Sequence, residues 1–169
     1  MFAIAVQPSQ QTKPGIALYP PVVARLSSEI SIFEELSQVW AVASLMSPSG
    51  EVLYERLRGK IADSAHPMAD AGDGSSNQQR AMKDRAYFYF PDLVIDTPGR
   101  YRIRISLMRV THSFESSPEG EVQYDDYVDT HSIVVNEGLS NHSRPSSRER
   151  TFLRILEEDG QDIPSSAPA

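Results

Sequence analysis

Cysteine is absent from this sequence of 169 residues. Without it the chain has no disulfide framework, no thiolate metal site and no cysteine nucleophile, and a reducing compartment is permitted. Long apolar runs are absent too, since no segment approaches the roughly 20 residues that a membrane helix needs. The opening MFAIAVQPSQ has no basic region, and its apolar run is too short for a signal peptide. We therefore expect a soluble intracellular protein with no membrane partner.

The sequence also lacks the motifs of common enzyme and metal sites. It contains no GxxxxGK[ST] and no GxGxxG, and no metal-ligand spacing such as HExxH occurs among His66, His112, His131 and His142. Ser64 and His66 stand close together but fall in a soft polar segment, without the rigid scaffold that a nucleophile and its base require. We predict no catalytic residue, metal, cofactor or small-molecule substrate.

Charge is unevenly distributed along the chain. The net charge of -7 and the pI near 5.1 argue against non-specific adhesion to nucleic acid. Even so, Lys13 and Arg25 are the only charged residues in 1–26, and residues 98–110 contain four arginines and no acid. The acids gather in 115–129 and 157–162. A local basic surface can therefore coexist with the negative net charge of the whole chain.

Short alternating segments separated by turn residues predict an all-β sandwich with long loops. The expected strands are FAIAV, YPPVVARL, QVWAVASLM, YFYF, RYRIRISL and YVDTHSIVV, and EVLYERL forms a hairpin with the strand before it. Near the end, Ser146 or Ser147 can cap a short helix that runs to about Asp159, with Gly160 as its stop. The segment 30–36 fits either a short helix or a turn.

At 18.8 kDa the chain has the size of one domain, which we place at residues 1–164. Residues 61–84 have too little apolar surface to offset the entropy lost on ordering, so we predict that they form a mobile insertion. We predict a disordered tail at 165–169. The tract with Asp125 and Asp126 is interpreted as a solvated acidic loop. The predicted core includes Trp40, Phe90, Tyr101, Ile103 and Ile105, and Tyr87 and Tyr89 are expected to be packing residues.

Three arginines in the strand RYRIRISL stand two residues apart, which places Arg100, Arg102 and Arg104 on one face. Two interpretations remain open. Guanidinium groups match phosphate geometry, so the face could contact DNA. Alternatively, it is a solvated sheet face whose arginines pair with nearby acids. The negative net charge favours the second interpretation.

The stretch YFYFPDLVIDTPGRYRIRISLMRV resembles the central signature of the fungal velvet domain. FAIAVQPSQQ, YPPVVARL and FLRILEEDGQDIP are similar to the opening strand, the double-proline strand and the closing helix of that family, in the same order. The resemblance implies an immunoglobulin-like sandwich related to the Rel-type DNA-binding domain. It also implies a regulator of fungal development and secondary metabolism, in nucleus and cytoplasm, that forms homo- or heterodimers with other velvet proteins.

One departure from the family concerns DNA binding. DNA-binding velvet proteins carry a basic cluster between the opening and double-proline strands, where this chain retains only Lys13. The candidate DNA-binding residues are Lys13, Arg25, Arg100, Arg102 and Arg104, and the dimer interface is not identified. Each lost phosphate contact weakens the electrostatic contribution to DNA affinity. We expect weak binding of duplex DNA by the chain alone, and the alternative is a protein-binding partner or scaffold without DNA affinity.

Overall fold

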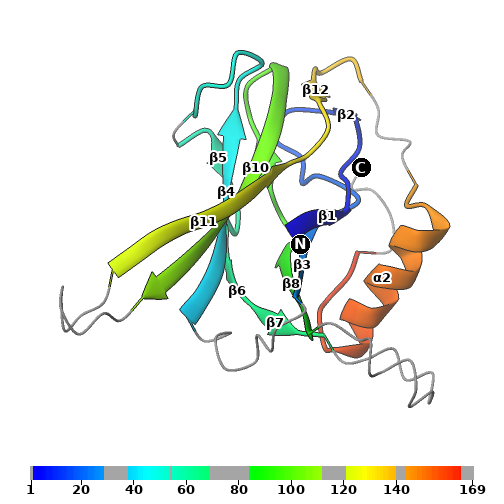
Figure 1. Ribbon diagram of the computed structural model, residues 1–169. Coiled ribbons are helices and arrows are strands. Elements are labelled where there is room, and N and C mark those ends of the chain that lie inside the picture. The colour runs from blue at the N-terminus through cyan, green and yellow to red at the C-terminus, as the bar shows by residue number, and fades with distance from the viewer. Residues whose placement is uncertain are drawn as a thin grey trace.

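The computed structural model describes residues 2–28, 38–53, 55–68, 84–111, 121–139 and 144–164. Its elements are β1 (Phe2–Val6), β2 (Gln11–Thr12), β3 (Val22–Ser28), β4 (Val39–Met46), β5 (Leu57–Arg58), β6 (Ala62–Ser64), β7 (His66–Pro67), β8 (Asp84–Phe90), β9 (Val94–Ile95), β10 (Gly99–Thr111), β11 (Glu121–Asp129), β12 (Ile133–Val135) and the helix α2 (Ser147–Glu158). Figure 1 shows three layers, with β4, β10 and β11 on the left, β1, β3 and β8 in the middle and α2 on the right. The predicted all-β sandwich with a C-terminal helix is confirmed.

The smaller sheet has the strand order β1-β3-β8-β7, with antiparallel neighbours throughout. Pro20 and Pro21 immediately precede β3, as expected for residues that cannot donate a ladder hydrogen bond. In β3 the side chains of Val22 and Ala24 face the other sheet, while Val23 faces α2. The middle layer is therefore apolar on both faces near the start of β3.

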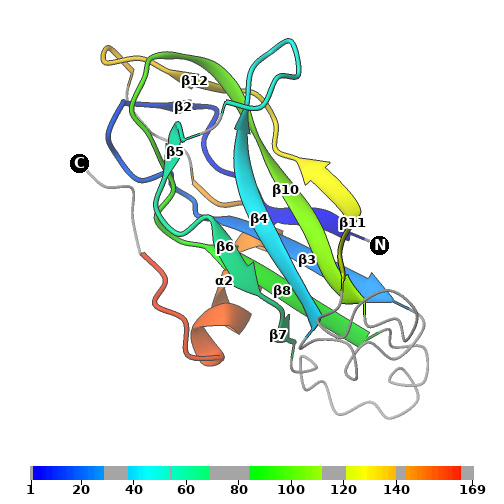
Figure 2. The same cartoon turned by 90° about the vertical axis from the view of Figure 1, so that its left-hand side faces the viewer.

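The larger sheet has the order β2-β12-β10-β4-β6, and β11 also pairs with β10. The long strand β10 runs antiparallel to β4 along one edge, and along its other edge it pairs first with β12 and then with β11. Figure 2 shows β4 and β10 side by side across the molecule, with β11 beyond β10. The predicted hairpin after β4 is present as a turn at 47–50 and a single bridge between Met46 and Val52.

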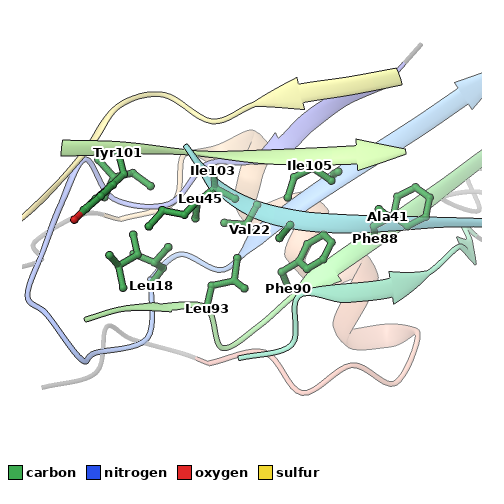
Figure 3. Close-up of a cluster of buried hydrophobic side chains, with 14 of the residues drawn as sticks. Leu18, Val22, Ala41, Leu45, Phe88, Phe90, Leu93, Tyr101, Ile103 and Ile105 are labelled. Atoms are coloured by element: carbon green, nitrogen blue, oxygen red, sulfur yellow. The ribbon is translucent and has the colours of Figure 1, made fainter. Parts of the chain in front are cut away.

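The main core lies between the two sheets. Figure 3 shows Ile103 and Ile105 of β10 facing Val22 and the aromatic rings of β8. Phe90, Tyr101, Ile103 and Ile105 are buried, which confirms four of the five predicted core residues. The prediction for Trp40 is wrong, because the core side of β4 is formed by Val39, Ala41, Ala43 and Leu45, and Trp40 is half-buried on the outer side. Both faces of β4 carry apolar residues, so the sequence pattern could not select the inward one.

A second apolar cluster holds α2 against the outer face of the smaller sheet. Leu153 and Leu156 are buried there with Val6, Val23, Tyr87 and Tyr89. The helix begins with a capping box, in which Ser146 Oγ accepts from the Glu149 amide and the Glu149 carboxylate accepts from the Ser146 amide. Gly160, at φ +98°, ends it. The predicted cap, extent and stop of the helix are confirmed.

Two segments differ from their predicted loops. The predicted mobile insertion at 61–84 begins with strands β6 and β7, which pair with β4 and β8, and ends within β8. Residues 69–83 lie outside the described residues, as do 30–36 and the tail 165–169, so their predicted behaviour stays a prediction. Asp125 and Asp126 belong to β11 rather than to a loop, because this segment pairs with the second half of β10.

Candidate nucleic-acid interface

The arginines of β10 share the outer face of the larger sheet. Tyr101, Ile103 and Ile105 face the core, so the alternate residues Arg100, Arg102 and Arg104 face outward. Arg100 and Arg102 are exposed, and Arg104 is half-buried. The predicted common face is confirmed.

Arg104 is held by an acid of the neighbouring strand. Its Nε donates to Asp129 Oδ1 at 2.8 Å, and a terminal nitrogen donates to Oδ2 at 3.1 Å. Asp129 lies directly opposite Arg104 in the β10–β11 register, and the guanidinium also stands 3.9 Å above the Tyr127 ring. A bidentate pair of this kind fixes both the charge and the orientation of the guanidinium. Arg104 is thus neutralised locally, as predicted.

The other cations of this face have no such partner among the described residues. Arg100 and Arg102 make no ion pair with any residue that the structure describes, so the pairing predicted for Arg102 is not found there. Lys13 follows β2, and Val134 of β12 lies opposite both Gln11 of β2 and Arg100 of β10. Lys13 is exposed at that same end of the sheet. The larger sheet therefore has two such cations on its outer face and a third, Lys13, at its β2 edge, with no ion pair among the described residues.

Arg25 lies on the other side of the sandwich. It stands in β3 between Ala3 of β1 and Tyr87 of β8, and it is exposed. Because Ala24 faces the core, Arg25 points to the side that α2 covers. The full thickness of the core separates Arg25 from Arg102. The five candidate residues consequently do not form one surface.

The outer face of the larger sheet also bears apolar side chains. Trp40 lies opposite Met108 in the β4–β10 register, and Val42 lies opposite Ser106. All three apolar side chains are half-buried, and Tyr127, opposite Ser106 on β11, is 46% exposed. This surface is mixed, with aromatic and aliphatic groups beside arginines, rather than a dense cationic one.

Comparison with protein families places this geometry in context. The family model for the velvet factor matches residues 9–148, which include every strand from β2 to β12. The chain belongs to the velvet factor family. This is a family of regulators rather than enzymes. None of the curated proteins compared with the chain matches it.

The velvet domain contains a buried acid that sequence reasoning missed. The side chain of Asp63 in β6 is 3% exposed and accepts hydrogen bonds from the Tyr89 amide at 2.8 Å and from His66 Nε2 at 3.0 Å, while Lys60 Nζ lies 2.9 Å away. Burial acts to raise the pKa of the Asp63 carboxyl, but the hydrogen bonds from His66, Tyr89 and Lys60 outweigh it and hold the pKa below its usual value.

This cluster serves to connect strands. Asp63 links β6 to β8 through the Tyr89 amide, and the His66 ring stacks on Tyr87 at a centroid distance of 4.9 Å. His66 therefore bonds to Asp63, while Ser64 lies opposite Trp40 in the sheet register. No signal in the polar composition of residues 61–84 marks the cluster, because a buried ion pair replaces the apolar side chains that patterns detect.

Tyr87 and Tyr89 join the sheet to the C-terminal segment. The Tyr87 hydroxyl donates to the Asp159 carboxylate and accepts from Gln161, and the Tyr89 hydroxyl donates to the Asp162 carbonyl at 2.9 Å. Burial raises the pKa of both phenols, that of Tyr89 to about 12. Both side chains are buried, so the predicted packing role is confirmed.

No helix among the described residues is long and apolar enough to cross a membrane. The same residues contain no group of three or more histidine, aspartate or glutamate side chains that could hold a metal ion.

Proposed function

We propose that this velvet protein regulates transcription in fungal development and secondary metabolism by forming dimers with other velvet proteins, in nucleus and cytoplasm. The observation that carries the proposal is the velvet match over residues 9–148. In this proposal the protein is not an enzyme, and it needs no cofactor, metal or small-molecule substrate. Its own affinity for duplex DNA is weak.

Weak DNA binding is supported by how the cations are arranged. Arg104 is neutralised by Asp129, and Arg25 is on the opposite side of the core from Lys13, Arg100 and Arg102. The electrostatic term scales with the number of phosphates neutralised. Three cations on the larger sheet support non-specific binding of roughly 10⁻⁴ to 10⁻⁶ M at physiological salt. A basic velvet partner would supply further contacts.

The second candidate is a protein-binding partner or scaffold with no DNA affinity of its own. It is supported by the half-buried apolar side chains Trp40, Val42 and Met108, which share the outer face of the larger sheet with Tyr127. Aromatic residues, methionine and arginine are enriched in protein interfaces. The same surface therefore suits contact with another protein.

Size-exclusion chromatography with light scattering tests dimerisation, for the chain alone and mixed with other velvet proteins from the same fungus. We expect the mass of a dimer in at least one of these samples. A monomer in every sample would contradict the proposal. The matching functional test is expression of a velvet-regulated reporter in cells that lack the gene for this chain.

A salt-titrated anisotropy assay with labelled duplex DNA separates the two candidates. We compare Arg102→Gln with Arg104→Gln, which remove the same charge from neighbouring positions. If the sheet face contacts phosphate, Arg102→Gln makes the slope of log K against log salt less negative by about 0.9. Arg104→Gln changes this slope less, because the charge of Arg104 is already paired with Asp129. Absence of binding by the wild type at low salt would favour the scaffold.

A further inference from the structure

The C-terminal helix and its lead-in carry arginines that the candidate interface does not include. Arg144 precedes the helix, and Arg148, Arg150 and Arg154 lie within it. All four are exposed, and none makes an ion pair with a residue that the structure describes. Residues 144–154 contain these four arginines and one acid, Glu149, for a net charge of +3 in a chain of -7. Arg150 and Arg154, four residues apart, share one side of the helix, and Arg148 lies on its other flank. We call the four residues together the arginine surface.

The stability of the helix does not explain these charges. Cations near a helix N-terminus oppose the macrodipole, and here the first turns are basic while Glu157 and Glu158 stand at the C-terminal end. Arg150 and Arg154 are four residues apart, so they are like-charged neighbours that repel each other. A helix selected only for stability would reverse this order. The arrangement is therefore better explained by contact with an anion.

Two amide groups at the start of the helix, those of Ser146 and Glu149, are occupied by the capping box. The Glu149 carboxylate accepts from the Ser146 and Gln7 amides, and Ser146 Oγ accepts from the Glu149 amide. Glu149 is half-buried and turned toward β1 through these bonds, which leaves the exposed side to the arginines.

The exposed side of the helix has no apolar component. Leu153 and Leu156 are buried against the smaller sheet, with Phe152 and Ile155 half-buried beside them, and every exposed side chain in 144–158 is polar or charged. A protein interface normally includes an apolar, well-packed centre. Contact with a phosphate backbone needs only cations, and guanidinium forks suit it.

We propose that the arginine surface, Arg144, Arg148, Arg150 and Arg154, binds the phosphate backbone of duplex DNA. This inference rests on the proposed function as a transcriptional regulator and adds a surface that the family match does not specify, since Arg150 and Arg154 lie beyond residue 148. The surface is on the α2 side of the sandwich, away from Arg100 and Arg102 on the outer face of the larger sheet (Figure 1). One straight duplex cannot contact both sides at once.

The test is a salt titration of anisotropy with the full chain and a labelled duplex of random sequence. Four phosphate contacts predict a slope of log K against log salt near -3.6, since each contributes about 0.9. The variant Arg148→Gln/Arg150→Gln/Arg154→Gln should reduce the slope to about -1 and weaken binding at least tenfold at low salt. Glutamine has nearly the helix propensity of arginine, so the helix is retained.

A matched control lowers the net charge by the same three units at exposed residues outside the candidate DNA-binding residues. The variant Val52→Glu/Arg56→Glu removes one positive charge and adds two negative charges, and it should keep the wild-type slope. An equal loss in both variants would show a general charge effect and overturn the proposal. The melting temperature of the helix variant should equal or exceed that of the wild type, because the removed charges oppose the dipole. A lower value would indicate a structural role instead.

Two further outcomes separate this inference from the proposed function. Polyglutamate that competes with DNA as strongly as unlabelled duplex would identify an acidic protein as the partner and overturn the DNA assignment. A wild-type chain that binds no DNA at low salt would overturn the inference, whereas dimerisation seen by light scattering would still support the proposed function. A monomer that binds DNA through the arginine surface would do the reverse.

Discussion

Asp63 offers the most direct test of the fold, because one buried carboxylate joins three partners. Replacing it with alanine removes the acceptor for the Tyr89 amide and the partner of His66 and Lys60. An unsatisfied buried amide costs about 1–3 kcal/mol, and each hydrogen bond to a charged group contributes about 1.5–3 kcal/mol. Lys60 is half exposed, so its share is screened, and the relieved burial of the carboxylate offsets part of the loss. We expect Asp63→Ala to cost about 2–4 kcal/mol.

Asp63→Asn separates charge from hydrogen bonding. The amide oxygen can still accept from the Tyr89 backbone, but the ionic contacts to His66 and Lys60 are lost, so we expect about 1–2 kcal/mol. Urea unfolding followed by Trp40 fluorescence measures both changes. Glu157→Ala is the control, because that side chain is exposed and makes no hydrogen bond within the described residues. Its effect should stay within about 0.5 kcal/mol.

The pH dependence gives the sign of the charge effect. Folding lowers the pKa of Asp63 below the value of about 3.9 of an unfolded aspartate, so its stabilisation is present above that pH. The stabilisation is lost as pH falls through the folded-state pKa. The stability gap between wild type and Asp63→Asn should therefore shrink below about pH 4. A gap that stays constant from pH 7 to pH 3, or a neutral Asp63→Ala, would refute the reasoning.

Three further predictions use the same unfolding measurement. Ile103→Ala should cost about 2–5 kcal/mol, because Ile103 is fully buried between the sheets, and a neutral result would place it at the surface. Gly59→Ala should destabilise the fold by more than about 1 kcal/mol, since Gly59 has φ +103° and a Cβ there would stand 2.2 Å from the Asp92 carbonyl; the Gly50→Ala change at an open turn is the comparison. Burial raises the pKa of Tyr89 to about 12, so the wild type should lose stability as pH rises from about 10 through that value, and Tyr89→Phe should lose less. Equal alkaline losses in both proteins would contradict that assignment.

The strand β10 was predictable because its two faces differ in chemistry. Arginine alternates with Tyr101, Ile103 and Ile105, so only one register buries the apolar residues and solvates the cations. The helix was predictable for a similar reason, since its cap, apolar stripe and Gly160 agree on one position. For β10 and for the helix, the local sequence was sufficient to predict which residues are buried.

Trp40 and Asp63 show where sequence patterns are insufficient. Both faces of β4 are apolar, and the choice between them depends on which face meets β8 across the core, a contact that local sequence does not encode. Asp63 is buried because Tyr89, His66 and Lys60 come together around it from separate positions in the chain. A small polar segment with one buried ion pair has the composition of a loop. Tertiary contacts decide both outcomes.

The division of cations between two sides limits what this velvet protein can do alone. The larger sheet offers Arg100 and Arg102 on its outer face and Lys13 at its β2 edge, all without ion pairs in the described chain. The α2 side offers the arginine surface. Either set supports a salt slope of only about -3 to -4, which fits non-specific affinity at physiological salt. A partner protein bound beside either set of cations would place further cations along the duplex. The slope of log K against log salt would then become more negative. Stable DNA binding should therefore depend on dimerisation, and the partner's contribution is measurable as the difference in slope between the dimer and the isolated chain.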